Sequence, residues 1–457
     1  MMKMHSSTSE MRPEKAGFCG LAPLLEDGGF DCPACGRRHT VTLRRAVIKR
    51  GALEALPASL RALGVTKAFL LADPNTWKAA GARAASLLKD AGIPFTAHVL
   101  RASKPAPDEA TCGEAMLYWD PSCDGIVGVG GGVINDTSKI LACLARRPYL
   151  YVGTAPSMDG YAFTSSSMER DGLKTTIAAV APDVILADTE VLRRAPRDMI
   201  LGGVGDMAAK YVSLAEWRMA SMITGEYYCA EVARMMQSSV DRVAEQAAAA
   251  VQGDADAVAA VTEGLIVAGL AMTCAGISRP ASGVEHYISH IRDMRSLAFG
   301  TRADWHGIQS GWAVLPSLRI YEKLRTVTPD RERALAHARD FDYAAHAAAM
   351  RSFIGPGAEA MIALEAKEKK YDAARHAVRL ERILSRWDEL RAEMEAMPSA
   401  ASVEAFYRSI GFPTKAEELG MTETEVFESF RFAGDIRDKY VLTRLLWDLG
   451  IPLEEML

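Results

Sequence analysis

The first part of the chain alternates between short apolar runs and longer stretches with helical periodicity. Residues 77–92 and 133–147 repeat apolar positions every three or four residues, which predicts amphipathic helices. Alternation of strands with such helices is typical of a parallel, Rossmann-like sheet covered by helices. The apolar runs that predict the strands are residues 68–74 (AFLLADP), 95–102 (FTAHVLRA), 125–132 (GIVGVGGG), 148–157 (PYLYVGTAPS) and 183–192 (DVILADTEVL).

From about Pro196 onward the pattern becomes almost entirely helical. A chain of 457 residues exceeds the length at which a single core usually stops growing, so we expect more than one domain. The predicted units are an N-terminal extension (1–40), an α/β domain (41–195) and an all-α domain (196–457). The segments with the clearest helical periodicity are residues 230–251, 257–272, 307–324 and 373–397.

Composition narrows the class of protein. A net charge of −5 without any Lys/Arg run argues against a nucleic-acid partner. The first eighteen residues are polar and lack the apolar core of a signal peptide. The apolar stretch 264–278 looks too short to span a bilayer, which takes about 20 residues. We therefore expect a soluble cytoplasmic protein with no membrane partner.

A glycine-rich segment, GVGGGVINDTSK (128–139), stands where a predicted strand passes into a helix. Exposed backbone N–H groups and a helix N-terminus at such a point can bind phosphate. The spacing does not match G-x-G-x-x-G and follows the third predicted strand, so a plain glycine turn remains an alternative. Asp73 ends the first predicted strand, where a carboxylate can meet ribose hydroxyls or simply form an Asp-Pro turn.

Three of the nine histidines, His286, His290 and His306, lie close together in the sequence. The first two are four residues apart and would share one face of a helix. Asp206 lies between apolar helical positions in GVGDMAAK and would be buried at a cost unless its charge is used. One aspartate with two histidines leaves open positions on a metal, as catalytic sites require, and suits zinc, iron or nickel. Surface or capping histidines are the alternative.

A second candidate metal site is formed by Cys32, Cys35 and His39 in DCPACGRRH. This pattern could be half of a zinc ribbon, completed by Cys19 or by a partner chain, or an ordered loop with reduced thiols. Cys143 and Cys274 lie in apolar stretches, where buried reduced thiols are expected.

Taken together, the motifs resemble a known family. The glycine segment, TAPSMDGYA (154–162), DGLKTTI (171–177), GGVGDMAAK (202–210), SGVEHYISH (282–290) and the His-Gly pair at 306–307 resemble the bacterial sn-glycerol-1-phosphate dehydrogenases. These belong to the superfamily of dehydroquinate synthases, glycerol dehydrogenases and iron-dependent alcohol dehydrogenases. The resemblance covers residues 40–315 and implies a dehydroquinate synthase-like fold, with a dinucleotide-binding α/β domain and a helical domain that binds metal and substrate.

The resemblance also implies roles for individual residues. Asp206, His286 and His306 would hold the metal, and Asp206 and His290 would act in catalysis and touch the substrate together with Asp159. His290 would carry a proton without binding the metal. Phe163 replaces a serine that the family usually has, so a cofactor contact there would need Thr164 or Ser165. The residues implied to contact the cofactor are Gly130, Gly131, Gly132, Val133, Ile134, Thr154, Ala155, Pro156 and Ser157, with Asp73 added from its position.

The implied reaction is the interconversion of dihydroxyacetone phosphate and sn-glycerol 1-phosphate by hydride transfer with NAD or NADP. It would use one divalent metal ion, with zinc preferred and nickel or iron as alternatives. Lys174 and Lys210 are candidates for binding the substrate phosphate. The family suggests a homodimer or larger homo-oligomer and a role in phospholipid metabolism.

Three other functions remain as alternatives to this reaction. A glycerol dehydrogenase or another polyol or alcohol dehydrogenase would take an unphosphorylated substrate. The others are a dehydroquinate synthase-like lyase and a regulator that has lost catalysis.

Overall fold

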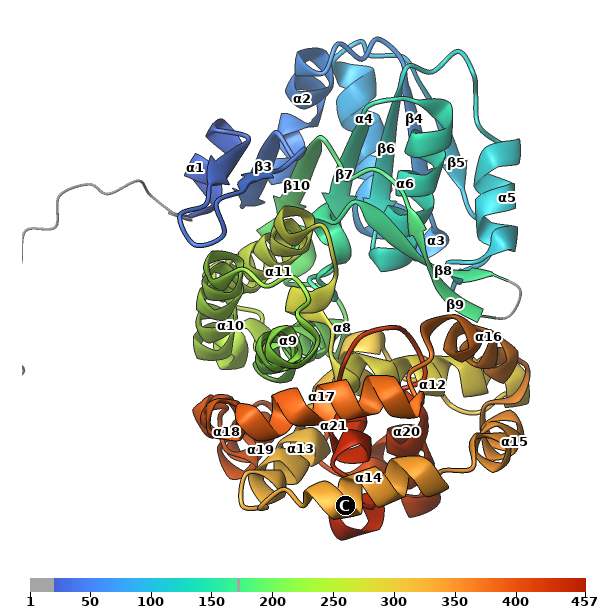
Figure 1. Ribbon diagram of the computed structural model, residues 1–457. Coiled ribbons are helices and arrows are strands. Elements are labelled where there is room, and N and C mark those ends of the chain that lie inside the picture. Colours follow the sequence, from blue (N-terminus) through green and yellow to red (C-terminus); the bar gives the residue numbers. More distant parts are fainter. Residues whose placement is uncertain (1–19, 171–172) are drawn as a thin grey trace, which may run out of the picture.

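The computed structural model describes residues 20–170 and 173–457, and a six-stranded parallel sheet forms the centre of the first half of the chain (Figure 1). The strand order is β3-β10-β7-β6-β4-β5, and every neighbouring pair is parallel. The parallel sheet expected from the alternating pattern is therefore confirmed. The strands are β3 (Arg45–Lys49), β4 (Ala68–Ala72), β5 (Phe95–Val99), β6 (Gly125–Gly130), β7 (Tyr149–Gly153) and β10 (Val184–Asp188).

Strand β3 was not predicted, so the glycine segment follows the fourth strand of this sheet in chain order and not the third. β3 is an edge strand with basic residues at both ends, and Val47 is its one buried residue, which leaves no continuous apolar run. Two short antiparallel hairpins were also missed because their sequences are largely polar. They are β1 (Gly29–Asp31) with β2 (Arg38–Thr40), and β8 (Ser165–Arg170) with β9 (Leu173–Ala178).

The sheet is covered on both faces because successive apolar residues of each strand point in opposite directions. On one face, Leu70 and Val127 pack with α2 (Leu56–Ala62) and α4 (Ala82–Asp90). On the other, Phe69 and Ile126 belong to the core shared with α6 (Gly132–Ala145) and the helical half. Cys143 is exposed on α6, so the expected burial of that thiol is wrong, whereas Cys274 is buried.

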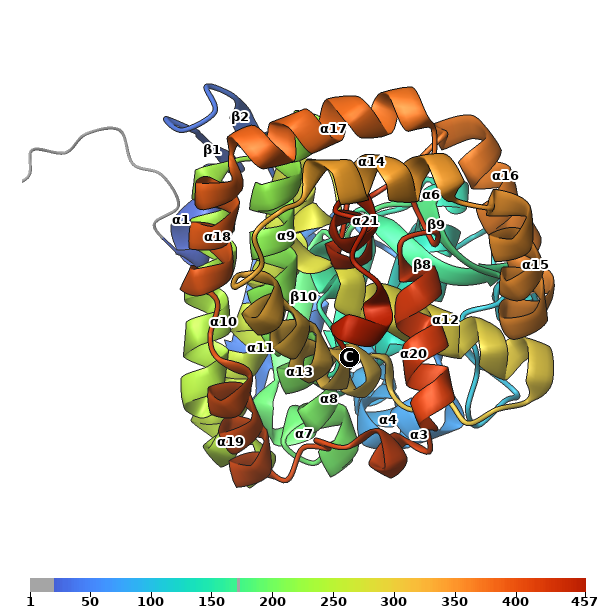
Figure 2. The ribbon, with the colours of Figure 1, turned by 60° about the horizontal axis from the view of Figure 1, so that its bottom comes forward.

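The second half of the chain is helical, as predicted, and lies below the sheet in Figure 1; Figure 2 shows the same helices from beneath. The predicted helix 373–397 is divided into two by Arg386. The remaining α-helices of four or more residues are α1 (Leu21–Glu26), α5 (Glu109–Leu117), α7 (Thr189–Leu192), α8 (Arg197–Ala208), α9 (Lys210–Thr224), α10 (Ala230–Val251), α11 (Ala255–Ala275), α12 (Val284–Phe299), α13 (His306–Leu324), α14 (Arg331–Asp340), α15 (Tyr343–Ile354), α16 (Ala358–Glu368), α17 (Ala373–Ser385), α18 (Trp387–Ala396), α19 (Ala400–Ile410), α20 (Glu423–Ala433) and α21 (Leu442–Asp448).

Helix α11 is longer than the apolar stretch recognised in the sequence. Its 21 residues are long and apolar enough to cross a membrane, so the expectation that this segment is too short is wrong. However, 83% of its most apolar window is buried inside the protein. The helix packs between α10 and the underside of the sheet, and it is therefore explained as a core helix.

Candidate active site

The residues expected to contact the cofactor lie at the carboxyl ends of adjacent parallel strands. The connection from β4 leads outward to β5 on one side, and the connection from β6 leads outward to β7 on the other, so the strand order reverses between β4 and β6. Such a reversal leaves a crevice in which open α/β sheets bind ligands. The backbone N–H of Thr154, after β7, donates to the Gly130 carbonyl at 3.0 Å, which joins the two expected cofactor segments.

The N-terminus of α6 is free of side-chain capping. Gly131 is its N-cap residue and has no side chain to occupy the first N–H groups of this 14-residue helix. Those donors and the positive end of the helix dipole are suited to an anion such as a pyrophosphate.

Asp73 forms an Asp-Pro turn, which was the alternative to a contact with the cofactor ribose. Its Oδ1 accepts hydrogen bonds from the backbone N–H groups of Asn75 and Thr76, and it caps the short helix α3 (Pro74–Thr76). Since β4 is paired with β6, Asp73 nevertheless lies beside the glycine segment. Its contact with a ribose remains a prediction.

Asp206, His286 and His306 come from three different helices and meet in the interior. Asp206 lies on α8, His286 on α12, and His306 is the first residue of α13. One ligand atom from each lies within 4.8 Å of the others, and His286 Nε2 is 3.3 Å from Asp206 Oδ1. Asp206 is completely buried. Two imidazoles and a carboxylate at this spacing form a donor set suited to a divalent ion with open coordination positions.

Neighbouring side chains fix how the two histidines are oriented. Glu285 Oε1 accepts a hydrogen bond from His286 Nδ1 at 2.9 Å, which leaves Nε2, the nitrogen that faces Asp206, as the one that could bind a metal. The Ser289 hydroxyl is 2.9 Å from His306 Nδ1. Carboxylate and hydroxyl partners of this kind hold metal-binding histidines in one tautomer. Glu285 was not recognised in the sequence because adjacent residues on a helix do not normally face each other. Only the structure shows that its carboxylate reaches Nδ1 of His286.

Glycines allow the helices that carry these ligands to approach closely. A Cβ atom on Gly307 of α13 would lie 1.9 Å from the carbonyl oxygen of Gly202 on α8, and one on Gly205 would lie 2.3 Å from the carbonyl of Gly307. A Cβ on Gly203 would lie 2.0 Å from the Pro156 carbonyl in the predicted cofactor segment. The glycines of GGVGD therefore bring α8 into backbone contact with both α13 and the loop after β7.

Lys210 lies between two carboxylates and is not exposed to solvent. Its ammonium is 2.6 Å from Asp159 Oδ2 and 2.8 Å from Asp206 Oδ1, while the Asp159 N–H donates to Asp206 Oδ2 at 2.9 Å. Burial alone would raise the pKa of Asp206, but Lys210 and His286 hold it well below its usual range. Burial and the charge of Asp206 raise the pKa of Asp159. Lys210 is thus occupied in joining the two aspartates, which disfavours it as a phosphate ligand.

His290 is buried beside the cluster, and its ring stacks against His306 with centroids 5.6 Å apart. Its Nδ1 has no hydrogen-bond partner among the residues that the structure describes. Burial and the charge of Arg437 lower the pKa of His290, so the ring is neutral at physiological pH. Burial and His286 also lower the pKa of His306, to about 4. Neutral imidazoles can accept a proton or bind a metal.

A second group of three potential metal ligands contains His306 as well. In this group His290 and Asp293 take the places of Asp206 and His286. Asp293 already accepts from Gln309 Nε2 at 2.8 Å and lies 3.6 Å from the ammonium of Lys174. Among the described residues, no carboxylate accepts a hydrogen bond from His290 Nδ1 and fixes its tautomer. These contacts favour the set containing Asp206 as the metal site.

Two further groups near the site were not recognised in the sequence. Lys139, fully buried on α6, donates to the carbonyl of Gly160 and so holds the loop that carries Asp159. Arg437 lies in the segment after α20, close enough for its charge to act on His290, and forms no ion pair among the described residues. Lys139 ends the glycine-rich segment, but its sequence position gave it no role there, and Arg437 is far from the other site residues in sequence.

The serines of the hairpin after Phe163 contact residues of α6, and a cofactor contact by Thr164 or Ser165 remains a prediction. Ser166 is buried and donates to the Asp136 carbonyl on α6 at 3.1 Å, so it is used in packing. The Ser165 carbonyl accepts from Lys139 at 3.1 Å. The first two residues of the DGLKTTI motif lie outside the described residues.

Comparison with known proteins agrees with this geometry. Residues 47–196 match the family model described as iron-containing alcohol dehydrogenase. A glycerol-1-phosphate dehydrogenase [NAD(P)+] of Halalkalibacterium halodurans is 33% identical over 63% of this chain and 73% of its own length. The protein of the same name from Bacillus licheniformis is 28% identical over 91% of this chain and 92% of its own. The chain belongs to the glycerol-1-phosphate dehydrogenase family.

Members of the glycerol-1-phosphate dehydrogenase family are oxidoreductases, and the prediction of an enzyme of this class is confirmed. The fold is confirmed separately. A probable glycerol dehydrogenase from Sinorhizobium meliloti superimposes with a TM-score of 0.58 at 17% identity, over 90% of this chain and 95% of its own. The motifs that resemble the glycerol-1-phosphate dehydrogenase family include the segments after β6 and β7 and parts of α8, α12 and α13. These elements form the candidate site between the sheet and the helical half.

Proposed function

We propose that this enzyme reversibly reduces dihydroxyacetone phosphate to sn-glycerol 1-phosphate, with NADH or NADPH as the hydride donor. The observation that carries the proposal is the cluster of Asp206, His286 and His306. The helix that carries Asp206 touches the predicted cofactor segment, and relatives of the chain are named for this reaction. The cofactor would lie across the ends of β4, β6 and β7, with its pyrophosphate at the N-terminus of α6.

Asp206, His286 and His306 would hold one divalent ion, for which zinc is preferred and nickel or iron are alternatives. When bound, such an ion supplies Lewis acidity at the substrate carbonyl. The chain supplies the rest of the chemistry. Asp159, held by Lys210, would orient a substrate hydroxyl. Neutral His290, whose Nδ1 has no partner among the described residues, would accept the proton of the reacting hydroxyl in the oxidation direction, and the protonated ring would return a proton to the reacting oxygen in the reduction direction.

Arg437 is the strongest candidate for the substrate phosphate, because a guanidinium binds phosphate through two parallel hydrogen bonds. Lys174, a candidate from the sequence, remains a secondary one since it is paired with Glu169 at 3.9 Å and Asp293 at 3.6 Å. We expect Arg437→Ala to raise KM for dihydroxyacetone phosphate about 10- to 100-fold, the loss of about 1.5–3 kcal/mol typical of charged hydrogen bonds, with little change in kcat.

Steady-state kinetics with and without the phosphate group test this assignment. Arg431→Ala is the matched control, since Arg431 is exposed on α20 and paired with Glu428. The KM for unphosphorylated dihydroxyacetone should be unaffected by Arg437→Ala. An equal effect on both substrates would mean that Arg437 does not bind the phosphate.

The reaction itself is tested by following NADH and NADPH oxidation with dihydroxyacetone phosphate after chelation and re-addition of zinc, nickel or iron separately. We expect activity to be lost on chelation and restored by one of these ions, with sn-glycerol 1-phosphate as the product. Glycerol is the comparison substrate for the alternative of a glycerol dehydrogenase. Preferential oxidation of glycerol over sn-glycerol 1-phosphate would overturn the proposal.

We also propose that the enzyme acts in the cytoplasm, in phospholipid metabolism, and assembles as a homodimer or larger homo-oligomer. They rest on the family resemblance and on the burial of α11, the one candidate membrane span within the described ranges.

A further inference from the structure

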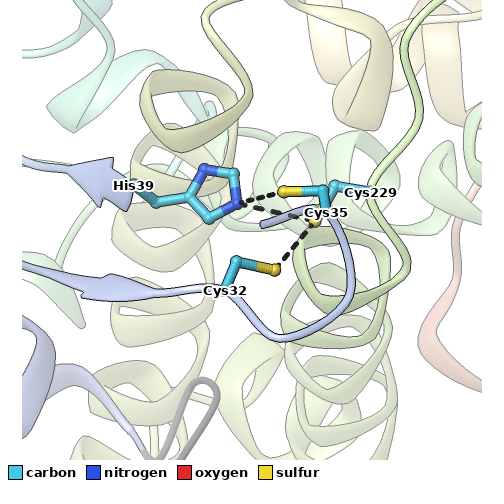
Figure 3. Close-up of side chains that lie close together, drawn as sticks. All are labelled: Cys32, Cys35, His39 and Cys229. Atoms are coloured by element: carbon cyan, nitrogen blue, oxygen red, sulfur yellow. Dashed lines mark hydrogen bonds between the residues drawn. The ribbon is translucent and has the colours of Figure 1, made fainter. Parts of the chain in front are cut away.

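A second group of metal-binding side chains lies apart from the active site, where the N-terminal hairpin meets the helical half (Figure 3). Cys32 and Cys35 lie in the turn between β1 and β2, and His39 lies on β2. The fourth member is Cys229, the residue that precedes α10. Cys19, which the sequence suggested as a possible completion, lies outside the described residues. The four residues are called the cysteine–histidine cluster below.

The turn holds the two thiols on the same side through its backbone. The Cys32 N–H donates to the Arg37 carbonyl and the Gly36 N–H to the Cys32 carbonyl, each at 2.9 Å. Gly36 has a φ of 70°, a conformation that glycine adopts without strain. The closely spaced cysteines are therefore preorganised before the distant Cys229 joins them.

The distances within the cysteine–histidine cluster match a tetrahedron around a missing centre. Bond lengths of about 2.3 Å to sulfur and about 2.05 Å to nitrogen place the corners of a tetrahedral zinc site about 3.8 Å (S–S) and about 3.6 Å (S–N) apart. The observed Cys32 Sγ–Cys229 Sγ distance is 3.5 Å. His39 Nε2 is 3.4 Å from Cys35 Sγ and 3.5 Å from Cys229 Sγ. All four ligand atoms lie within 4.8 Å of one another.

The tautomer of His39 is fixed independently of these thiols. Its ring is 2% exposed, and Nδ1 lies 2.7 Å from the carbonyl oxygen of Cys274 on α11. A carbonyl only accepts hydrogen bonds, so Nδ1 must carry the proton and Nε2 presents its lone pair to the sulfurs. An outer partner that orients the imidazole in this way is characteristic of zinc-binding histidines.

The surroundings favour a closed metal site over a disulfide or a redox-active thiol pair. A disulfide requires sulfur atoms about 2.05 Å apart, far less than observed between Cys32 and Cys229. These two thiols are 4% and 1% exposed, so they are not accessible for exchange with a partner. The Tyr227 hydroxyl donates to Cys35 Sγ at 3.6 Å and stabilises negative charge on that sulfur.

We propose that Cys32, Cys35, His39 and Cys229 bind one Zn²⁺ ion in a closed structural site. Three cysteines and one histidine are a common ligand set for structural zinc and leave no position for a substrate. The ion would join the β1–β2 hairpin to the start of α10, and His39 would join it to the end of α11. It is distinct from the ion proposed for catalysis, and its role is to hold the N-terminal segment on the helical half.

Cobalt spectroscopy of the full-length protein tests this without any substitution. The reduced metal-free protein is titrated with Co²⁺, which takes tetrahedral zinc sites and gives sulfur-to-cobalt charge-transfer absorption only where thiolates bind it. We expect this absorption in the wild type and in His306→Ala, which keeps the cysteine–histidine cluster. Its absence from the wild type would overturn the proposal, as would an intramolecular disulfide among Cys32, Cys35 and Cys229 in protein purified with reductant.

Metal content provides the second measurement. By elemental analysis, Cys35→Ser should hold one ion less per chain than the wild type and lose the charge-transfer absorption. Cys274→Ala is the matched control, because that thiol is buried nearby but is not a ligand. The thermal unfolding midpoint of Cys35→Ser should fall, while the metal requirement of any remaining activity should be unchanged. Equal metal content in Cys35→Ser and Cys274→Ala would contradict the site, whatever the outcome of the activity assays.

Discussion

His306→Ala is expected to lose the metal of the active site and at least 1,000-fold in kcat/KM, which corresponds to about 4 kcal/mol of transition-state stabilisation. His306 supplies one of three protein ligands, and alanine leaves only Asp206 and His286. The fold should persist, because His306 is the first residue of α13 and, among the described residues, its ring forms a hydrogen bond only with the Ser289 hydroxyl. Metal analysis, circular dichroism and steady-state kinetics on the same preparation measure the three effects.

The variant His290→Ala tests whether His290 transfers a proton and does not bind the metal. It should retain the metal and lose most of its turnover, because His290 stacks on His306 but does not belong to the favoured ligand set. If His290→Ala lost the metal and His306→Ala kept it, the grouping with Asp293 would be correct instead. His98→Ala, on β5 and paired with Glu114, controls for replacing a histidine elsewhere. If His306→Ala kept the turnover of the wild type, His306 would be excluded as a metal ligand.

The sequence predicted best those features that are encoded within one short segment. The strands β4, β6 and β7 are continuous apolar runs, so the sheet and its glycine turn could be recognised directly. His286 and His290 are one helical turn apart, and Asp206 was conspicuous as a charge in an apolar helix. The family and fold implied by these motifs are confirmed, whereas the roles of the individual residues remain predictions.

Features that depend on contacts between distant segments could not be predicted. Cys229 completes the cysteine–histidine cluster from 190 residues beyond His39, and nothing in its local sequence distinguishes it from a buried thiol. Arg437 reaches the neighbourhood of His290 from the last part of the chain. The sequence around Lys210 allows it to bind phosphate, but in the structure its ammonium is held by two carboxylates, Asp159 and Asp206. In each case the side chain acquires its role from neighbours that only the tertiary structure brings together.

The glycines of α8 and α13 show how packing determines the chemistry of this site. Asp206 and His306 can approach each other only because the two helices touch through backbone atoms. Any side chain at Gly307 would meet the Gly202 carbonyl at 1.9 Å, and that atom cannot rotate away. Protein interiors are packed too densely to absorb such an overlap without moving one helix.

Gly307→Ala is therefore expected to lower the free energy of unfolding by about 3 kcal/mol, the upper range for overpacking a core. The metal affinity should fall as well, because separating α13 from α8 moves His306 away from Asp206. Urea denaturation and competitive metal titration measure the two losses. The matched control is Gly113→Ala in α5, where an added Cβ meets nothing within 4 Å and should stabilise the helix by about 0.5–1 kcal/mol. If Gly307→Ala unfolded at the wild-type urea concentration and bound metal equally well, the close approach of the helices would not be what positions the ligands.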